Sequence, residues 1–207
     1  MPDFTLEDAH GGLVCGLDEV GRGPLAGPVV AACVYISAEC RTLPFIGDIK
    51  DSKKLRHPKR LSLDALIRQH CAWGIGQCEP EEIDAINILQ ASLKAMERAY
   101  AAMNAPADLA LIDGNRLPKS LPCAGKAVVK GDGISTSIAA ASIVAKVHRD
   151  KIMGQLAAEF PQYGWERNAA YPTAEHLAAI QIHGVTPHHR RSFGPVRNAM
   201  QNLKSGT

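Results

Sequence analysis

The stretch GLDEVGRGPLAGPVVAACV, residues 16–34, joins two apolar segments through a glycine-rich turn and carries two adjacent carboxylates. Residues 13–17 and 28–36 are apolar, and turn residues bound them, so they predict two strands. Asp18 and Glu19 stand where the first strand is expected to end. Adjacent side chains of a strand point to opposite faces, so both carboxylates can converge on one cation only if a turn or bulge distorts the chain there.

The next part of the chain alternates helix-like and strand-like patterns. Apolar residues at spacings of three and four indicate helices, and short apolar runs indicate strands. The prediction is helix 59–70, strand 72–78, helix 81–103, strand 108–112, strand 126–130 and a helix to about residue 160. Ser135 or Ser137 is expected to cap the last helix. This order predicts an α/β domain with a mixed sheet.

The C-terminal part has a different character. Beyond Tyr171 the pattern is helical, with Thr173 and Thr186 as expected caps and Gly184 as an expected stop. After Glu175 the chain contains no acidic residue, although several arginines follow. The distribution of charge therefore gives a basic C-terminal stretch.

Composition excludes several classes of protein. The chain has 207 residues, of which 46% are hydrophobic, enough for one large domain or a domain with a small appendage. The net charge of +2 is by itself a weak indication of nucleic-acid binding. The six cysteines form no C-x-x-C pair, so no zinc site is expected. We see no apolar signal segment and no run that could span a membrane, and we expect a cytoplasmic protein with reduced thiols.

Two further carboxylates follow predicted strands. Asp113 comes directly after strand 108–112, and Asp132 follows strand 126–130. Sites in α/β sheets are built at the carboxyl ends of strands, and clustered carboxylates need cations to offset their repulsion. Oxygen ligands alone suit Mg²⁺ or Mn²⁺. The alternatives are a solvated strand end for Asp18 and a helix-dipole contact for Asp132.

The glycine-rich turn does not match a dinucleotide-binding loop. Gly21, Gly23 and Gly27 give G-x-G-x-x-x-G, and a strand follows where that fingerprint needs a helix. Glycines here allow the backbone to approach a ligand closely, with Arg22 beside it; a bulged hairpin turn is the alternative.

Two basic segments offer contacts to phosphates. DSKKL supplies Lys53 and Lys54, although a solvated basic loop would look the same. The segment HHRR, residues 188–191, supplies Arg190 and Arg191. No partner at ligand spacing supports a histidine metal site in that segment.

From about Cys15 to Val196, the sequence closely resembles bacterial ribonuclease HII. Besides the opening stretch, the matching blocks are DSKKL, INILQASLKAM, LIDGN, VVKGDGISTSIAAASIVAKVHRD and YPTAEHLAAIQIHGVTPHHRRSFGPV. The resemblance implies an RNase H-like fold, with a mixed five-stranded sheet flanked by helices and a helical C-terminal extension. We expect the catalytic domain at residues 1–165 and the extension at residues 166–207, packed on it as one structural unit.

The resemblance also implies a reaction. The expected enzyme is an endonuclease that hydrolyses the RNA strand of RNA/DNA hybrids and cuts 5′ of single ribonucleotides embedded in duplex DNA. The products would carry a 5′-phosphate and a 3′-hydroxyl. Two divalent cations, Mg²⁺ or Mn²⁺, would bind at the positions matching Asp18, Glu19, Asp113 and Asp132. The expected partners are hybrid duplexes and ribonucleotide-containing DNA, for a protein that acts as a monomer.

Substrate contacts are implied in the same way. In the family the G-R-G loop reads the ribose 2′-hydroxyl, and the matching tyrosine stacks on the deoxyribose of the next nucleotide. The substrate-binding residues expected are Gly21, Arg22, Gly23, Lys53, Lys54, Lys146, Tyr171, Arg190 and Arg191. The family usually has Lys-Gly before that tyrosine, whereas this chain has Ala169 and Ala170, which removes one charge and changes the backbone freedom leading to Tyr171.

Two other functions fit the same residues. A nuclease on the same fold that cuts DNA without needing a ribose would share the carboxylates. A non-catalytic protein that binds hybrids would share the basic segments. The G-R-G loop argues against the first, and four intact carboxylates argue against the second.

Overall fold

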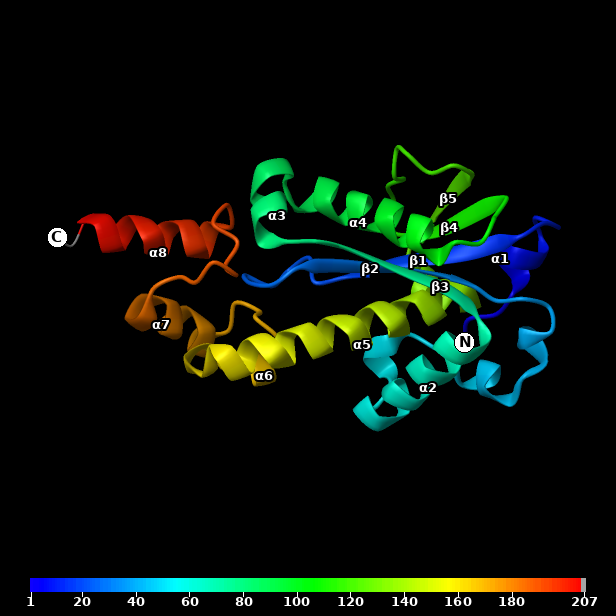
Figure 1. The fold of residues 1–207 in the computed structure, drawn as a ribbon, viewed down its shortest axis with the longest axis horizontal. Coiled ribbons are helices and arrows are strands. Elements are labelled where there is room, and N and C mark those ends of the chain that lie inside the picture. The colour runs from blue at the N-terminus through cyan, green and yellow to red at the C-terminus, as the bar shows by residue number, and fades with distance from the viewer. Residues whose placement is uncertain (206–207) are drawn as a thin grey trace.

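The computed structural model describes residues 1–205 and contains one five-stranded sheet (Figure 1). The strand order across the sheet is β3-β2-β1-β4-β5. The strands are β1 (Val14–Val20), β2 (Val29–Tyr35), β3 (Ala72–Cys78), β4 (Leu109–Asp113) and β5 (Ala124–Val128). β2 is antiparallel to both β1 and β3, whereas β4 is parallel to both β1 and β5. The predicted mixed sheet is confirmed.

Strand β1 is longer than predicted and contains both adjacent carboxylates. Asp18 pairs with Ala32 and Glu19 with Ala31 in an unbroken register from Cys15 to Val20. The expected strand end or bulge at this point is therefore wrong. Continuous pairing with β2 keeps the strand regular, so the two carboxylates leave the sheet on opposite faces.

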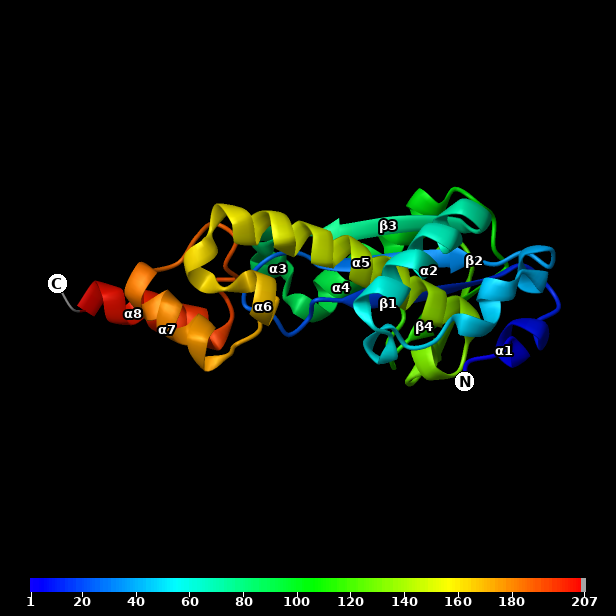
Figure 2. The same cartoon turned by 90° about the horizontal axis from the view of Figure 1, so that it is seen from below.

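Each face of the sheet is covered by a long helix (Figures 1 and 2). Helix α4 packs against β3 and β2, and helix α5 packs against β1 and β2 on the other face. The helices are α1 (Thr5–Asp8), α2 (His57–His70), α3 (Pro80–Ile86), α4 (Ile88–Met103), α5 (Thr136–Glu159), α6 (Trp165–Asn168), α7 (Ala174–His183) and α8 (Gly194–Ser205). Gly16 lets α5 lie close to β1, because a Cβ there would stand 2.2 Å from the Ser137 carbonyl carbon.

Two of the predicted elements differ from the structure. The single helix expected at residues 81–103 breaks at Asn87, which has a φ of 68° and accepts hydrogen bonds from the amides of Leu89 and Gln90. The side chain thus caps α4 and separates it from α3. Strand β5 ends at Val128, two residues earlier than expected, because Lys130 turns the chain with a φ of 57°. Ser135 caps α5, as one of the two predicted candidates.

The C-terminal helices share a third core cluster with the loop after β1. Leu25 and Ala26 pack with Met153 of α5 and with buried residues of α7 and α8. Thr173 caps α7 and Gly184 ends it, as predicted. Thr186 caps no helix; it is buried in the loop before α8. The division of the chain between residues 165 and 166 stays a prediction, and residues 206–207 lie outside the described part.

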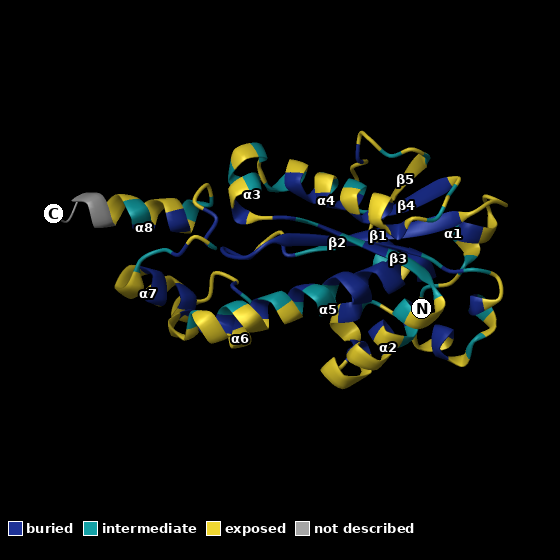
Figure 3. Cartoon of the chain, in the orientation of Figure 1, coloured by how far each residue is buried: buried dark blue, intermediate teal, exposed yellow. Residues whose placement is uncertain are grey.

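Burial follows the layers (Figure 3). The central strands and the first half of α5 are buried, whereas edge strand β5 is exposed along most of its length. All six cysteines are free thiols, and four of them are buried, as expected for cysteines that pack in the core. Within residues 1–205, the helices are too short or too polar to cross a membrane.

Candidate active site

Three neighbouring elements bring the predicted carboxylates to one edge of the sheet. Asp18 follows the pair formed by Leu17 and Ile112, so it lies beside Asp113 at the end of the parallel strand β4. Asp132 lies in the 3-10 turn Gly131–Gly133 that leads from β5 into α5. The arrangement results from parallel strands whose carboxyl ends meet at one edge.

Asp18 is the most buried of the four carboxylates, with 5% of its surface exposed. Burial raises the pKa of Asp18 well above its ordinary value, and the neighbouring carboxylates of Glu19, Asp113 and Asp132 raise it further, against a hydrogen bond from Ser142 of α5. Burial and three neighbouring carboxylates thus both oppose the charged form of Asp18.

Ser142 was not predicted from the sequence. Its hydroxyl lies 2.8 Å from the hydroxyl of Ser52, which belongs to the DSKKL segment. The Arg60 guanidinium donates a 2.8 Å hydrogen bond to the Ser52 carbonyl. A chain of contacts thus joins Asp18 to the loop that carries Lys53. The only sequence signal was a serine on the buried face of an alanine-rich helix.

Glu19 leaves the opposite face of β1, toward α4. Its Oε1 accepts a 3.1 Å hydrogen bond from Arg22, while its Oε2 is buried without a partner. Burial raises the pKa of Glu19, although Arg22 opposes that shift. A small hollow of about 40 Å³ lies here, between Glu19, Asp113 and the α4 residues Ser92 and Met96.

Asp113 and Asp132 each have a partner from a neighbouring loop. Asp113 accepts a 2.6 Å hydrogen bond from the Gly131 amide, and burial raises its pKa. Asp132 lies 3.7 Å from the Lys53 ammonium. Burial lowers the pKa of Lys53, but Asp132 and Asp18 outweigh it, so the net shift is upward. The turn that carries Asp132 and the lysine segment therefore meet at this edge.

The four carboxylates fit divalent cations by their chemistry. Among residues 1–205, no three acidic, histidine or cysteine side chains stand close enough together to enclose an ion as they are. The carboxylates are held by Arg22, Lys53 and the Gly131 amide instead. The donors are all oxygens, Asp18 is raised in pKa by the other three carboxylates, and Glu19 Oε2 has no partner. Such a set suits hard cations such as Mg²⁺ or Mn²⁺.

Two buried arginines hold the G-R-G loop and the residues beside it from the protein interior. Arg190 is fully buried and donates to the carbonyl oxygens of Gly21, Arg22 and Gly27, at 2.6–3.2 Å. Arg149 of α5 donates to the carbonyl oxygens of Ala26 and Pro28, which follow the loop, and of Ala169, which precedes Tyr171. The expected role of Arg190 as a phosphate contact is therefore wrong for this conformation, because its donors are occupied inside the protein. Arg149 was not predicted.

Gly21 has no room for a side chain. Its φ is +92°, and a Cβ would lie 2.3 Å from Nε of Arg149. Glycine is needed both for the backbone conformation and for the arginine beneath it. The sequence prediction that this glycine lets the backbone approach a ligand stays a prediction. The group that comes close from inside is a guanidinium.

Tyr171 lies over the same loop with 48% of its surface exposed. A Cβ on Gly23 would stand 3.1 Å from Cε1 of the tyrosine. Ala169 and Ala170, which replace the usual Lys-Gly, both have positive φ values of 47° and 64°. Asn168 holds this turn, because its Oδ1 accepts from the Ala170 amide and its carbonyl accepts from the Tyr171 amide.

The remaining predicted substrate residues differ in side-chain exposure and in their partners. Lys53 and Lys54 have largely exposed side chains. Lys146 lies one helical turn after Ser142 and pairs with Asp150 at 2.6 Å. Arg191 is exposed, and its backbone amide donates to Asp84 of α3. The ammonium groups of Lys53, Lys54 and Lys146 each lie near a carboxylate, at 3.7, 3.8 and 2.6 Å, and their role as phosphate contacts stays a prediction, as does that of Arg191.

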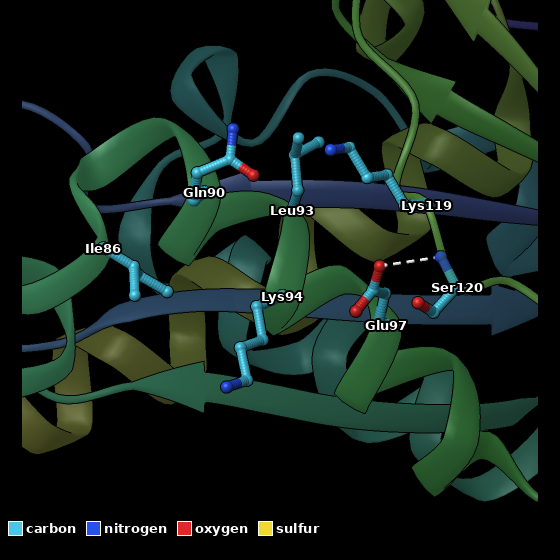
Figure 4. Close-up of a pocket in the computed structure, with 7 residues that line it drawn as sticks. All are labelled: Ile86, Gln90, Leu93, Lys94, Glu97, Lys119 and Ser120. Atoms are coloured by element: carbon cyan, nitrogen blue, oxygen red, sulfur yellow. Dashed lines mark hydrogen bonds between the residues drawn. The ribbon is translucent and has the colours of Figure 1, made fainter.

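A second hollow, of about 310 Å³, lies away from the carboxylates (Figure 4). It lies between α4 and the loop before β5, and its acidic residue, Glu97, already accepts a 2.9 Å hydrogen bond from the Ser120 amide. The lining residues are Ile86, Gln90, Leu93, Lys94, Glu97, Lys119 and Ser120. None of the predicted site residues belongs to it.

Comparison with known proteins gives the family. The family model described as Ribonuclease HII matches residues 15–196. This chain belongs to the ribonuclease HII family. A curated ribonuclease HII from Rhodospirillum rubrum is 59% identical over 202 residues, which cover 97% of this chain and 92% of the relative. The chain is accordingly an endoribonuclease of the RNase H type, which acts on the RNA strand of RNA/DNA hybrids.

Solved structures support the fold independently. The ribonuclease H2 from Pyrococcus horikoshii OT3 superposes with a TM-score of 0.76 at 24% identity, over 92% of this chain and 98% of the other. Bst-RNase HIII, solved in complex with Mn²⁺, superposes with a TM-score of 0.74 at 17% identity, over 93% of this chain and 70% of the other. At these identities the likeness concerns the fold alone.

Proposed function

We propose that this ribonuclease HII cuts DNA duplexes 5′ of a single embedded ribonucleotide, in addition to hydrolysing RNA in longer hybrids. The contact between Tyr171 and Gly23 carries this proposal. A half-exposed aromatic ring beside a glycine loop offers a stacking surface for one sugar next to a backbone that can read its neighbour. The same loop begins directly after Asp18 and Glu19, so recognition and cleavage would act on adjacent nucleotides.

The four carboxylates are proposed to hold two divalent cations, Mg²⁺ or Mn²⁺. When bound, such a pair activates water for in-line attack and neutralises the leaving 3′-oxygen, which leaves a 5′-phosphate on the product. Asp18, the most buried of the four, would hold the cations together with Glu19, Asp113 and Asp132. Ser142 would fix the orientation of the Asp18 carboxylate, and Arg22 would have to release Glu19.

The G-R-G loop is proposed to distinguish ribose from deoxyribose. RNA differs from DNA locally by the 2′-hydroxyl, which needs a donor or acceptor within hydrogen-bond distance. Gly23 has no side chain that could cover its backbone, and Arg22 is half exposed. Arg190 and Arg149 keep the loop rigid from inside, so little ordering is needed on binding.

The basic residues around the site are proposed to bind the phosphates of the duplex. Lys53, Lys54, Lys146 and Arg191 remain assigned to this role. Phosphate contacts position a duplex without reading its sequence, which suits an enzyme whose target can occur anywhere in DNA. We further propose that the protein acts as a monomer in the cytoplasm, in ribonucleotide excision repair and in DNA replication.

The decisive experiment compares three substrates under Mg²⁺ and Mn²⁺: a duplex with one ribonucleotide, a long RNA/DNA hybrid and an all-DNA duplex. We expect cleavage of the first two, with the cut in the first on the 5′ side of the ribonucleotide. Cleavage of the all-DNA duplex at a similar rate would instead support a nuclease that ignores ribose. Binding without cleavage under either metal would support a non-catalytic hybrid-binding protein.

A further inference from the structure

Two buried histidines lie directly behind Tyr171. His176 of α7 and His189 of the loop before α8 are 0% and 1% exposed, and their Nε2 atoms are 3.2 Å apart. The Trp165 indole donates a 3.0 Å hydrogen bond to His176 Nε2. The other ring nitrogen, His176 Nδ1, lies 3.0 Å from the carbonyl oxygen of Tyr171. The pair is therefore linked to the backbone of the exposed tyrosine.

The partners of the two rings fix where their protons are. The backbone amide of Thr186 can only donate, and it lies 3.0 Å from His189 Nδ1, which must accept. His189 therefore carries its proton on Nε2 and donates it to His176 Nε2. The Trp165 indole is also only a donor, so it shares the single Nε2 lone pair of His176 with the His189 donor. His176 thus carries its proton on Nδ1, where it donates to Tyr171.

The surroundings keep both rings neutral. Burial lowers the pKa of His176, and burial together with the neighbouring histidines His176 and His188 lowers the pKa of His189 to about 3. The rings of Tyr163 and Trp165 pack against both imidazoles, with centroids 4.9–6.0 Å apart. A proton added to His176 Nε2 would face the Trp165 and His189 donors, and a proton added to His189 Nδ1 would face the Thr186 amide.

The turn before Tyr171 needs such support. Ala169 and Ala170 both adopt left-handed backbone conformations, which cost an alanine free energy that a glycine would not lose. The Tyr171 carbonyl accepts from His176 Nδ1 and from the Thr173 amide, so it is held by two donors. Without the histidine, one short local hydrogen bond would remain to fix the peptide that orients the tyrosine ring over Gly23.

We infer that His176, in its Nδ1-protonated neutral form and locked by His189 and Trp165, is a positioning residue that sets Tyr171 for recognition of the junction nucleotide. The inference rests on the proposed function of Tyr171. His176 touches no substrate; it acts through the Tyr171 carbonyl. It should therefore affect cleavage at single ribonucleotides much more than cleavage inside long hybrids, where recognition of a junction is not needed.

The first test does not depend on activity. Long-range ¹H–¹⁵N NMR of the histidine-labelled full chain at neutral pH should show His176 protonated on Nδ1 and His189 protonated on Nε2. The opposite tautomer at His176, or a charged ring there, would overturn the inference, whichever substrates the enzyme cuts. Because this measurement uses the native chain, it remains decisive even if a variant fails to fold.

The second test follows the tyrosine itself. His176→Leu removes the donor, whereas His176→Asn retains an amide donor near the position of Nδ1. His183→Leu, at the exposed end of α7, is the matched control. With 3-fluorotyrosine incorporated, the ¹⁹F resonance of Tyr171, assigned with Tyr171→Phe, should move in His176→Leu and stay in place in the other two. An unmoved resonance in His176→Leu would overturn the inference.

The third test measures substrate choice. For His176→Leu we expect the ratio of kcat/KM for the single-ribonucleotide duplex over the long hybrid to fall about fivefold or more, as for a lost hydrogen bond. His176→Asn should restore most of that ratio, and His183→Leu should leave it unchanged. An equal loss on both substrates would indicate a merely structural role and overturn the inference. If the native enzyme does not cut the single-ribonucleotide duplex, the proposed function fails, and the two NMR measurements still decide the position of Tyr171.

Discussion

Gly23 and Tyr171 lie so close that any Cβ at residue 23 would stand 3.1 Å from Cε1 of the tyrosine. Residues almost 150 positions apart in the chain thus form one surface. That surface continues into Arg22 and Glu19, whose side chains are 3.1 Å apart. The contact thus joins Gly23, which is proposed to approach the ribose, to Tyr171, which is proposed to stack on the sugar of the next nucleotide.

Gly23→Leu should therefore displace Tyr171 and reduce cleavage of a single-ribonucleotide duplex about tenfold or more, because a 1 Å misplacement of a positioning group is costly. Gly47→Leu is the matched control, since nothing lies within 4 Å of a Cβ at that position. The measurement is kcat/KM on both variants. A normal rate for Gly23→Leu would refute the assigned role of this glycine.

Asp18→Asn and Asp113→Asn should each abolish cleavage, with losses of about a thousandfold, while hybrid binding is retained. The asparagine keeps the shape but loses the charge that holds a divalent cation, which is worth several kcal/mol in the transition state. Steady-state cleavage and filter binding check the two halves of the prediction. Asp48→Asn, at an exposed ion pair with Lys59, serves as the control. Turnover by either site variant at the native rate would contradict the metal assignment.

The metal-free protein should lose stability as the pH rises past the ordinary range of a carboxyl group. The folded pKa of Asp18 is raised, first by burial and then by its acidic neighbours. The folded state therefore keeps a proton that the unfolded chain has released, and the free energy of unfolding falls until the folded pKa is passed. Asp18→Asn should remove part of this fall.

Divalent cations should act in the opposite direction. Above the pH range of that fall, Mg²⁺ or Mn²⁺ should raise the Tm of the native chain and have a weaker effect on Asp18→Asn. Thermal melts with chelator and with each metal, over a series of pH values, give both results. Identical pH profiles for the two proteins would show that Asp18 is not the group responsible.

Arg190 and Arg191 should behave differently although they are adjacent. Arg190→Met leaves the carbonyls of Gly21, Arg22 and Gly27 without a buried partner and should cost about 2–4 kcal/mol of stability. Arg191→Met should change stability by less than about 0.5 kcal/mol, because this side chain is exposed. Urea unfolding measures both.

Binding at varied salt separates the two arginines further. Arg191→Met should reduce the salt dependence of duplex binding if Arg191 contacts a phosphate. Equal stability losses in the two variants would contradict the described burial of Arg190.

Ala169→Gly should stabilise the protein by about 0.5–1 kcal/mol, because the residue has a φ of 47° at the end of α6. The same change at Ala178, exposed inside α7, should destabilise it by about 1 kcal/mol. Urea unfolding gives both values. If both changes destabilise, the left-handed strain assigned to Ala169 is absent.

Much of the fold could be read from local patterns. Apolar runs and helical spacing predicted all five strands and the long helices, because burial repeats with the period of each element. These patterns did not predict the break at Asn87, because the apolar spacing continues from α3 into α4. A single residue with a positive φ divides the two helices. Likewise, Asp18 and Glu19 were expected beyond a strand that in fact includes them.

The sequence by itself pointed to the carboxylates and the glycine loop through their local motifs, and to the tyrosine through its resemblance to the ribonuclease HII family. Only the tertiary structure decided what holds them. Arg190 looked like a surface cation until packing placed it under the loop, and His176 had no recognisable partner in the chain until α7 brought it against Trp165 and Tyr171. Such contacts join segments far apart in sequence, and they depend on how helices and sheet pack. A local pattern records how each segment is buried, but not which distant group it meets.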